Sequence, residues 1–159
     1  MTEITLQGNK INTNGDVPKV GSAAPEFILV DSDLNDISLS NYDGKNIILN
    51  VIPSLDTPVC QKSTKIFNEK ASDLSDTVVL AVSADLPFAM KRFCSVESIE
   101  SVKPLSMMRS RNFAKDYGVL ITDGPLSGIT ARAVIVIDKN KKIIYSELVQ
   151  EIANEPNYE

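Results

Sequence analysis

The sequence predicts an α/β fold in which helices flank a mixed central β-sheet. Three apolar, β-branched runs, at 46–52, 77–83 and 131–137, have the composition of buried strands. Apolar residues recur at helical spacing between the first two runs, so a helix is expected to join two parallel strands there. A turn and a further short strand follow the third run, which predicts an antiparallel hairpin.

The residues before this sheet are expected to be extended. A turn at 7–10 separates short strands at 4–6 and 11–13, which predicts an N-terminal β-hairpin. Two prolines and a glycine make 17–25 an extended connector. A strand at 27–30 and a short element at 37–39 follow.

Two helices are predicted beside the parallel strands. The first runs from Pro58 to about Ala71, because Thr57 is a good N-cap and proline suits the first helical position. The second opens near Pro87, with Asp85 or a neighbour as its N-cap.

The rest of the chain is predicted from its turn signals. Gly118 ends a short helix at 112–117. The other expected features are a mobile polar loop at 95–103, turns at 122–125 and 138–141, a strand at 143–145 and a last helix that begins within 148–152. There is no internal repeat and no linker, so a single domain over 1–159 is expected, thioredoxin-like with an extra N-terminal β-hairpin.

Composition narrows the classes of function. The chain has 159 residues, 43% of them hydrophobic, and its net charge of −5 argues against nucleic acid or an anionic membrane as a partner. No apolar run reaches the roughly 18 residues of a membrane-spanning helix. The first residues lack the basic and apolar regions of a secretory signal, so a cytoplasmic protein is expected.

The chain contains no histidine. This excludes Ser-His-Asp and Cys-His catalysis, His-ligated haem and most catalytic zinc sites. Its two cysteines are too few for a four-thiolate metal site, and no cofactor is expected. Any chemistry at sulfur must therefore be activated by a helix terminus, an arginine or a lysine.

Cys60 is the leading candidate for such chemistry. The predicted helix start places it at the third helical position, where unpaired backbone N–H groups and the positive end of the helix dipole favour thiolate over thiol. The structural alternative is a small buried hydrophobe in the first turn of the helix.

The residues before Cys60 carry a family resemblance. The run Pro-Ser-Leu-Asp-Thr-Pro-Val-Cys at 53–60 resembles the Pro-x-x-x-Thr-x-x-Cys active-site signature of peroxiredoxins, and is close to that of the thiol peroxidase subfamily. Further segments that resemble the subfamily lie at 83–89, 92–94, 117–119, 123–126, 131–134 and 155–158, so the resemblance covers nearly the whole chain.

The resemblance implies an enzyme that reduces hydrogen peroxide and organic hydroperoxides. Cys60 would be the peroxidatic cysteine, whose thiolate attacks the O–O bond. Thr57 and Arg132 would hold the sulfur and the peroxide oxygens, and Pro53 would shield the pocket from water. Their structural alternatives are an N-cap for Thr57, a strand-end salt bridge for Arg132 and a strand terminator for Pro53.

Cys94, on the second predicted helix, matches the resolving cysteine of the subfamily. The resemblance implies an intramolecular Cys60–Cys94 disulfide that a thioredoxin reduces, in a protein that is commonly a homodimer. Two cysteines on separate helices rarely meet disulfide geometry without movement, so one or both turns are expected to unwind in each cycle. A buried structural cysteine is the alternative.

Two other functions compete with the peroxidase. A thiol–disulfide oxidoreductase would carry both thiols at one helix start, and the chain has no Cys-x-x-Cys. A redox sensor shares the first chemical step and stays open. The chain also departs from the subfamily at Lys65, where an arginine is usual, so a role of Lys65 in shaping the pocket is in doubt.

Overall fold

The computed structural model describes residues 2–71, 76–152 and 154–156, and its centre is a seven-stranded mixed sheet. From one edge to the other, the strands are β4 (Asp36–Ser38), β3 (Ile28–Val30), β7 (Val102–Ser106), β6 (Thr77–Ser83), β5 (Asn46–Val51), β8 (Ala133–Ile137) and β9 (Ile143–Leu148). The strands β5, β6 and β7 are parallel, and β3, β8 and β9 pair antiparallel with their neighbours. The predicted mixed sheet is thus confirmed.

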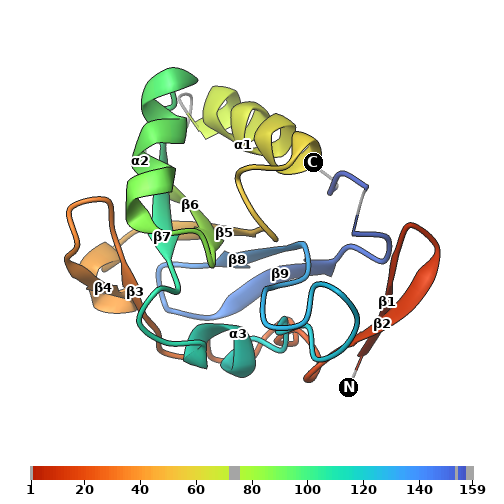
Figure 1. Ribbon diagram of the computed structural model, residues 1–159. Helices are drawn as coiled ribbons and strands as arrows, with labels where there is room; N and C mark the ends of the chain where they lie inside the picture. Colours follow the sequence, from red (N-terminus) through yellow and green to blue (C-terminus); the bar gives the residue numbers. More distant parts are fainter. Residues whose placement is uncertain (1, 72–75, 153, 157–159) are drawn as a thin grey trace.

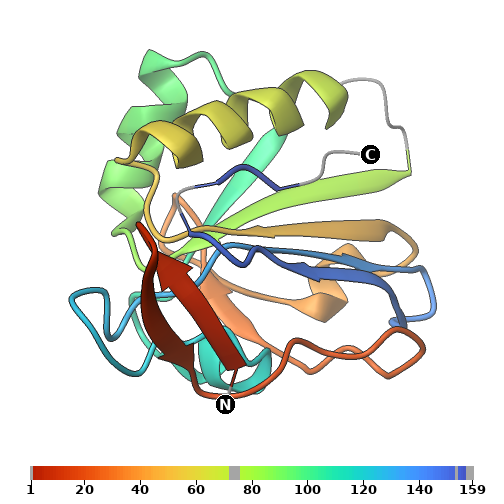
Figure 2. The ribbon, with the colours of Figure 1, turned by 90° about the vertical axis from the view of Figure 1, so that its right-hand side faces the viewer.

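Helices cover both faces of this sheet (Figure 1). Helices α1 (Pro58–Ala71) and α2 (Pro87–Val96) lie together on one face, and the short helix α3 (Asn112–Asp116) lies on the other, as Figure 2 also shows. A separate hairpin of β1 (Thr2–Leu6) and β2 (Asn9–Thr13) stands beside the sheet. The short element expected at 37–39 is the end of β4 together with a 3-10 turn, η1 (Leu39–Tyr42).

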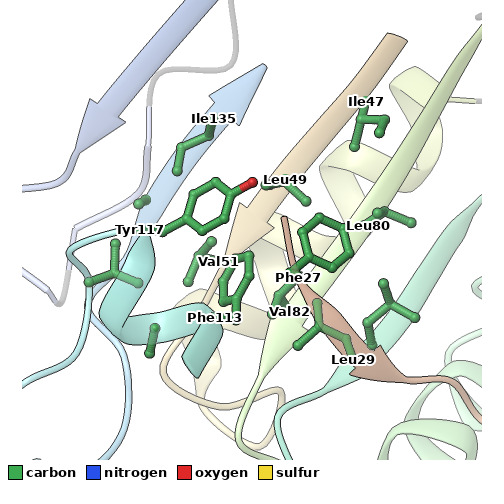
Figure 3. Packing of buried hydrophobic residues seen from close by; sticks show 14 of the residues in the cluster. Phe27, Leu29, Ile47, Leu49, Val51, Leu80, Val82, Phe113, Tyr117 and Ile135 are labelled. Carbon is green, nitrogen blue, oxygen red and sulfur yellow. The ribbon is translucent and has the colours of Figure 1, made fainter. Parts of the chain in front are cut away.

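Aromatic packing fills the α3 face of the sheet (Figure 3). The rings of Phe113 and Tyr117 stack with their centroids 4.5 Å apart, and Phe27 meets Phe113 edge to face at 5.6 Å. The buried Tyr117 hydroxyl donates to the carbonyl of Pro25 at 2.7 Å, so its polar end is satisfied. On the opposite face, Phe67 of α1 packs on the sheet with Val134.

The expectation of a mobile loop over 95–103 is wrong at both ends. Helix α2 continues to Val96, and β7 begins at Val102 and lies inside the sheet, between β3 and β6. This strand is difficult to recognise from the sequence because Lys103 and Pro104 interrupt its apolar pattern. Strands β3 and β7 pair only through Val30 and Ser106. Pro104, which has no N–H to donate, therefore removes little of the pairing between these two strands.

The last helix is also absent from its expected place. Residues 148–152 do not begin a helix: Leu148 ends β9, and the chain then bends and turns while it bridges to the hairpin through Thr5 and Glu151. Of the two possibilities for the N-cap of α2, Asp85 or a neighbour, the structure has the neighbour, Leu86, which makes no side-chain capping hydrogen bond. The Asp85 carboxylate instead accepts hydrogen bonds from the loop before α1.

Candidate active site

The junction between β5 and α1 presents Cys60 in the first turn of the helix. Beyond the end of β5, the Ile52 N–H donates to the Val82 carbonyl at 2.9 Å, and Pro53 is buried directly after it. Helix α1 begins at Pro58, as predicted, so Cys60 is its third residue. The side chain of Cys60 is fully buried against Ile52, and also against Leu55 and Met90.

Thr57 lies just before the helix and closes its first turn. Its carbonyl accepts a hydrogen bond from the Gln61 N–H at 2.9 Å, and its hydroxyl donates to the Ser54 carbonyl at 3.0 Å. A hydroxyl has one proton and two lone pairs, so the Thr57 oxygen keeps acceptor capacity toward the turn that carries Cys60.

The loop between Pro53 and the helix is anchored by Asp85, from the segment between β6 and α2. Its carboxylate accepts from the Ser54 hydroxyl, the Leu55 N–H and the Ser83 hydroxyl, each at 2.7 Å. Hydrogen bonds to an ionised acceptor are among the strong ones. Asp85 therefore ties the loop before Cys60 to the start of the helix that carries Cys94.

The role of Asp85 was not predicted from the sequence. The available signal was a carboxylate and two serines at the ends of neighbouring parallel strands, since Ser54 follows β5 and Ser83 ends β6. The paired ends of these strands bring the three side chains together.

Arg132 lies just before β8, and its side chain is 98% buried, with 2% of its surface exposed. Its neighbour Ala133 pairs with Val51, so Arg132 stands across from Ile52, the residue on which Cys60 packs. Alternation along the strand puts Arg132 on the face of Val134, which is the α1 face.

Only part of the guanidinium of Arg132 is hydrogen-bonded. Its Nε–H donates to the Ile152 carbonyl at 3.1 Å, whereas Nη1 is buried with no hydrogen-bond partner among the described residues. An unpaired buried donor on a charged group is costly unless something binds there. Arg132 forms no ion pair with another described residue, so the strand-end salt bridge that was the alternative for Arg132 is absent from this part of the chain.

Cys94 lies on α2, in a different hydrophobic cluster from Cys60. It is partly buried beside the cluster of Phe67 and Val134, and both cysteines are free thiols. Phe93 packs against this cluster and also against the one that holds Cys60. Burial raises the pKa of the Cys94 thiol, and the charge of Lys103 offsets part of that rise.

A groove of about 560 Å³ opens between the Asp85-anchored loop and α2. Leu55, Gln61, Arg92 and Phe93 are among its lining residues. Lys65 does not line this groove itself, but it forms a partly exposed ion pair with a lining residue, Glu97, with Nζ and Oε2 2.8 Å apart. Lys65 thereby joins α1 to the end of α2.

The described part of the chain contains no cluster of three or more His, Cys, Asp or Glu side chains suited to a metal ion. Within the same residues, no helix has the length and hydropathy of a membrane span.

Comparison with known proteins places the chain in a family. Residues 19–159 match the model of the redoxin family. Thiol peroxidases of Mycobacterium tuberculosis and Mycobacterium bovis are 53% identical over 159 residues, which is all of this chain and 95% of each relative.

Solved structures agree with the sequence comparison. A peroxiredoxin-like protein from Aquifex aeolicus superposes with a TM-score of 0.93 at 44% identity, over 99% of this chain and 92% of the other. A thiol peroxidase from Chromobacterium violaceum superposes with a TM-score of 0.91 at 25% identity, over 98% of this chain and 90% of the other. The fold is therefore the thioredoxin-like redoxin fold, and the chain belongs to the redoxin family, within its thiol peroxidase group of peroxiredoxin oxidoreductases.

Proposed function

We propose that this chain reduces hydroperoxides with Cys60 as the attacking sulfur. Two observations carry the proposal together: a buried thiol in the first turn of α1 packs on Ile52, and a buried guanidinium with an unpaired Nη1 lies across the sheet from that same residue. A helix N-terminus and a nearby cation both stabilise a thiolate, and the chain has no imidazole to do so.

The first step is an oxygen transfer. The Cys60 thiolate bonds to the terminal oxygen of the hydroperoxide, the O–O bond breaks, and Cys60 becomes a sulfenic acid. The departing oxygen takes a proton and leaves as water or an alcohol. The sulfur is oxidised by two electrons and the peroxide is reduced by two.

Thr57 and Arg132 hold the peroxide in line with the sulfur. The hydroxyl proton of Thr57 is engaged by Ser54, so its lone pairs accept from the peroxide O–H. The Nη1 of Arg132 donates to the oxygen on which charge develops as the O–O bond breaks. Pro53, buried at the base of the loop, keeps water away from the reacting atoms.

Cys94 completes the cycle. Its thiol condenses with the sulfenic acid of Cys60, which releases water and forms a disulfide. The two thiols of a thioredoxin then supply two electrons and two protons, restore both cysteines and become a disulfide themselves. The separate clusters of Cys60 and Cys94, with Phe93 against both, support a partial unwinding of α1, α2 or both before the sulfurs meet.

Steady-state peroxidase kinetics with a thioredoxin system test this proposal. Wild type is expected to consume many equivalents of peroxide, Cys60→Ser none, and Cys94→Ser a single equivalent that leaves a sulfenic acid trappable by a dione reagent. Activity in Cys60→Ser would overturn the assignment of the nucleophile. Wild type that stops after one equivalent would instead indicate a redox sensor.

A further inference from the structure

The side chain of Arg132 is positioned by a segment outside the main sheet. The Nε–H of Arg132 donates to the Ile152 carbonyl, and the carbonyl of Arg132 accepts from the Val149 N–H at 2.9 Å. Residues 149–152 follow β9 as a bend, a bridge residue and a turn, and the paired residues of β8 and β9 end at Ala133 and Leu148, just before this segment. The orientation of the guanidinium thus depends on where the Ile152 carbonyl stands.

The N-terminal hairpin holds that segment in place. The Thr5 N–H donates to the Gln150 carbonyl at 2.7 Å, and the Ile152 N–H donates to the Thr5 carbonyl at 2.9 Å. The Glu151 carboxylate accepts from the Gly8 N–H at 2.7 Å and from the Thr5 hydroxyl at 3.1 Å. Figure 1 shows the hairpin beside the chain that follows β9.

Apolar packing reinforces these hydrogen bonds. Ile4 and Ile11, one from each strand of the hairpin, are buried in one cluster with Ile152 and Ala131. Ala131 directly precedes Arg132, so the hairpin supports the chain on both sides of the guanidinium. The hairpin also lies outside the match to the redoxin family, which begins at residue 19.

We propose that the N-terminal hairpin is a positioning element for Arg132, acting through the Ile152 carbonyl. The inference depends on the proposed role of Arg132 at the peroxide. A guanidinium is planar and rigid, so the bond at Nε sets the direction in which Nη1 donates. If the Ile152 carbonyl moves, Nη1 turns away from the reacting oxygen, and misplacement by about 1 Å can cost on the order of 100-fold in rate.

Proline at position 5 tests the link while it keeps the hairpin. Both backbone polar groups of Thr5 face residues 150–152, so Thr5 and Lys10 form a non-hydrogen-bonded pair of the hairpin. Thr5→Pro therefore removes the bond to Gln150 without removing a bond between β1 and β2. Glu3→Pro is the matched control: Glu3 has the same register parity and makes no backbone hydrogen bond to residues 149–152.

The readout is the second-order rate of Cys60 oxidation by hydrogen peroxide, in single-turnover experiments on the full chain. Thr5→Pro is expected to slow this step by about 10- to 100-fold, and Glu3→Pro by less than about twofold. In the Arg132→Lys background, Thr5→Pro is expected to cost little more, because the residue it positions has already been replaced. A purely structural role would give the same penalty in both backgrounds.

Several outcomes would overturn the inference. A folded Thr5→Pro that is oxidised as fast as wild type would do so, and so would a penalty that persists in full beside Arg132→Lys. Should Thr5→Pro fail to fold, the pair Thr5→Val and Glu151→Ala, which together remove the side-chain part of the link, decides by the same readout. An Arg132→Lys variant as fast as wild type would remove Arg132 from the proposed reaction as well, which separates the two failures.

Discussion

Thr57 donates its only hydroxyl proton to the Ser54 carbonyl, and this fixes how it can meet a peroxide. Only its lone pairs remain, so in the proposed reaction it acts as an acceptor. Thr57→Val keeps the shape and removes the hydroxyl, and we expect kcat/KM for peroxide to fall by about 100-fold or more. Thr57→Ser keeps the hydroxyl and should stay within about tenfold of wild type. Equal activity of the Val variant and wild type would exclude the role.

The rate at which Cys94 forms the proposed disulfide should depend on pH in a direction that the structure defines. Because burial raises the pKa of its thiol, little of it is thiolate near neutral pH in the folded state. The thiolate is the form that attacks sulfur, so the rate of disulfide formation is expected to rise with pH through the alkaline range.

Replacing Lys103 tests the cause of this dependence. The charge of Lys103 lowers the pKa of Cys94, so Lys103→Met should move the pH profile of disulfide formation to higher pH. Lys91→Met is the control, because Lys91 lies on α2 like Cys94 but forms an ion pair with Asp33. Stopped-flow measurement of the resolution step after a peroxide pulse gives the profile. An unmoved profile would show that Lys103 does not act on Cys94.

At the scale of elements, the loop before α1 depends on a carboxylate supplied from beyond β6. Asp85→Asn keeps the shape but turns one of the two acceptor oxygens into a donor that faces other donors. We expect a loss of about 1–3 kcal/mol in the free energy of unfolding, together with a slower reaction of Cys60. Asp56→Asn, at an exposed position of the same loop, should change neither. Denaturant melts and single-turnover rates measure both effects.

The proposed unwinding belongs to helices α1 and α2. With Cys60 fully buried and Phe93 packed against both clusters, disulfide formation should open the first turn of α1, the end of α2, or both. Amide hydrogen exchange in these two stretches is expected to be faster in the oxidised than in the reduced protein. Strand β6 serves as the internal reference. Equal exchange in both redox states would contradict the unwinding.

How far the sequence predicts each element depends on whether its signals are local. Helix α1 and strand β6 have the predicted bounds, because a capping residue, a proline and a continuous β-branched run mark their ends. Strand β7 was missed because only its neighbours in space make Lys103 and Pro104 part of a sheet. The apolar residues of 148–152 fit a helix, but the hairpin, far away in sequence, supplies their backbone partners instead.

The residues of the candidate site, like the elements, could be predicted where their signals are local in the sequence. Cys60 and Thr57 belong to one short motif, so their positions at the start of α1 could be predicted from the sequence. The anchoring role of Asp85 could not, because it arises only when two parallel strands end side by side. The hydrogen bond that the Arg132 Nε–H donates ends on a carbonyl 20 residues later in the chain, which no local pattern around Arg132 indicates.

At the scale of the whole molecule, the backbone at Gly118, just after α3, lies close to the backbone of Asp16, just after the hairpin. Gly118 has a φ of +70°, and a Cβ there would lie 2.0 Å from the Asp16 carbonyl oxygen. Gly118→Ala should therefore cost more than the roughly 1–2 kcal/mol of a left-handed alanine. At Gly128, with a φ of +100° and no atom near the Cβ position, alanine should cost only the conformational part. Urea unfolding of both variants gives the comparison, and equal losses would contradict the clash.

The two edge strands of the sheet, β4 and β9, affect how readily the protein could aggregate if it opens part of itself in every turnover, as proposed. Strand β4 has only three residues, and the start of β9 is covered by Ser22, whose carbonyl accepts from the Ile143 N–H at 2.9 Å. Short or covered margins offer a neighbouring molecule little backbone on which to add a strand. Cycles of oxidation that reshape only the helical layer should therefore leave the protein resistant to aggregation.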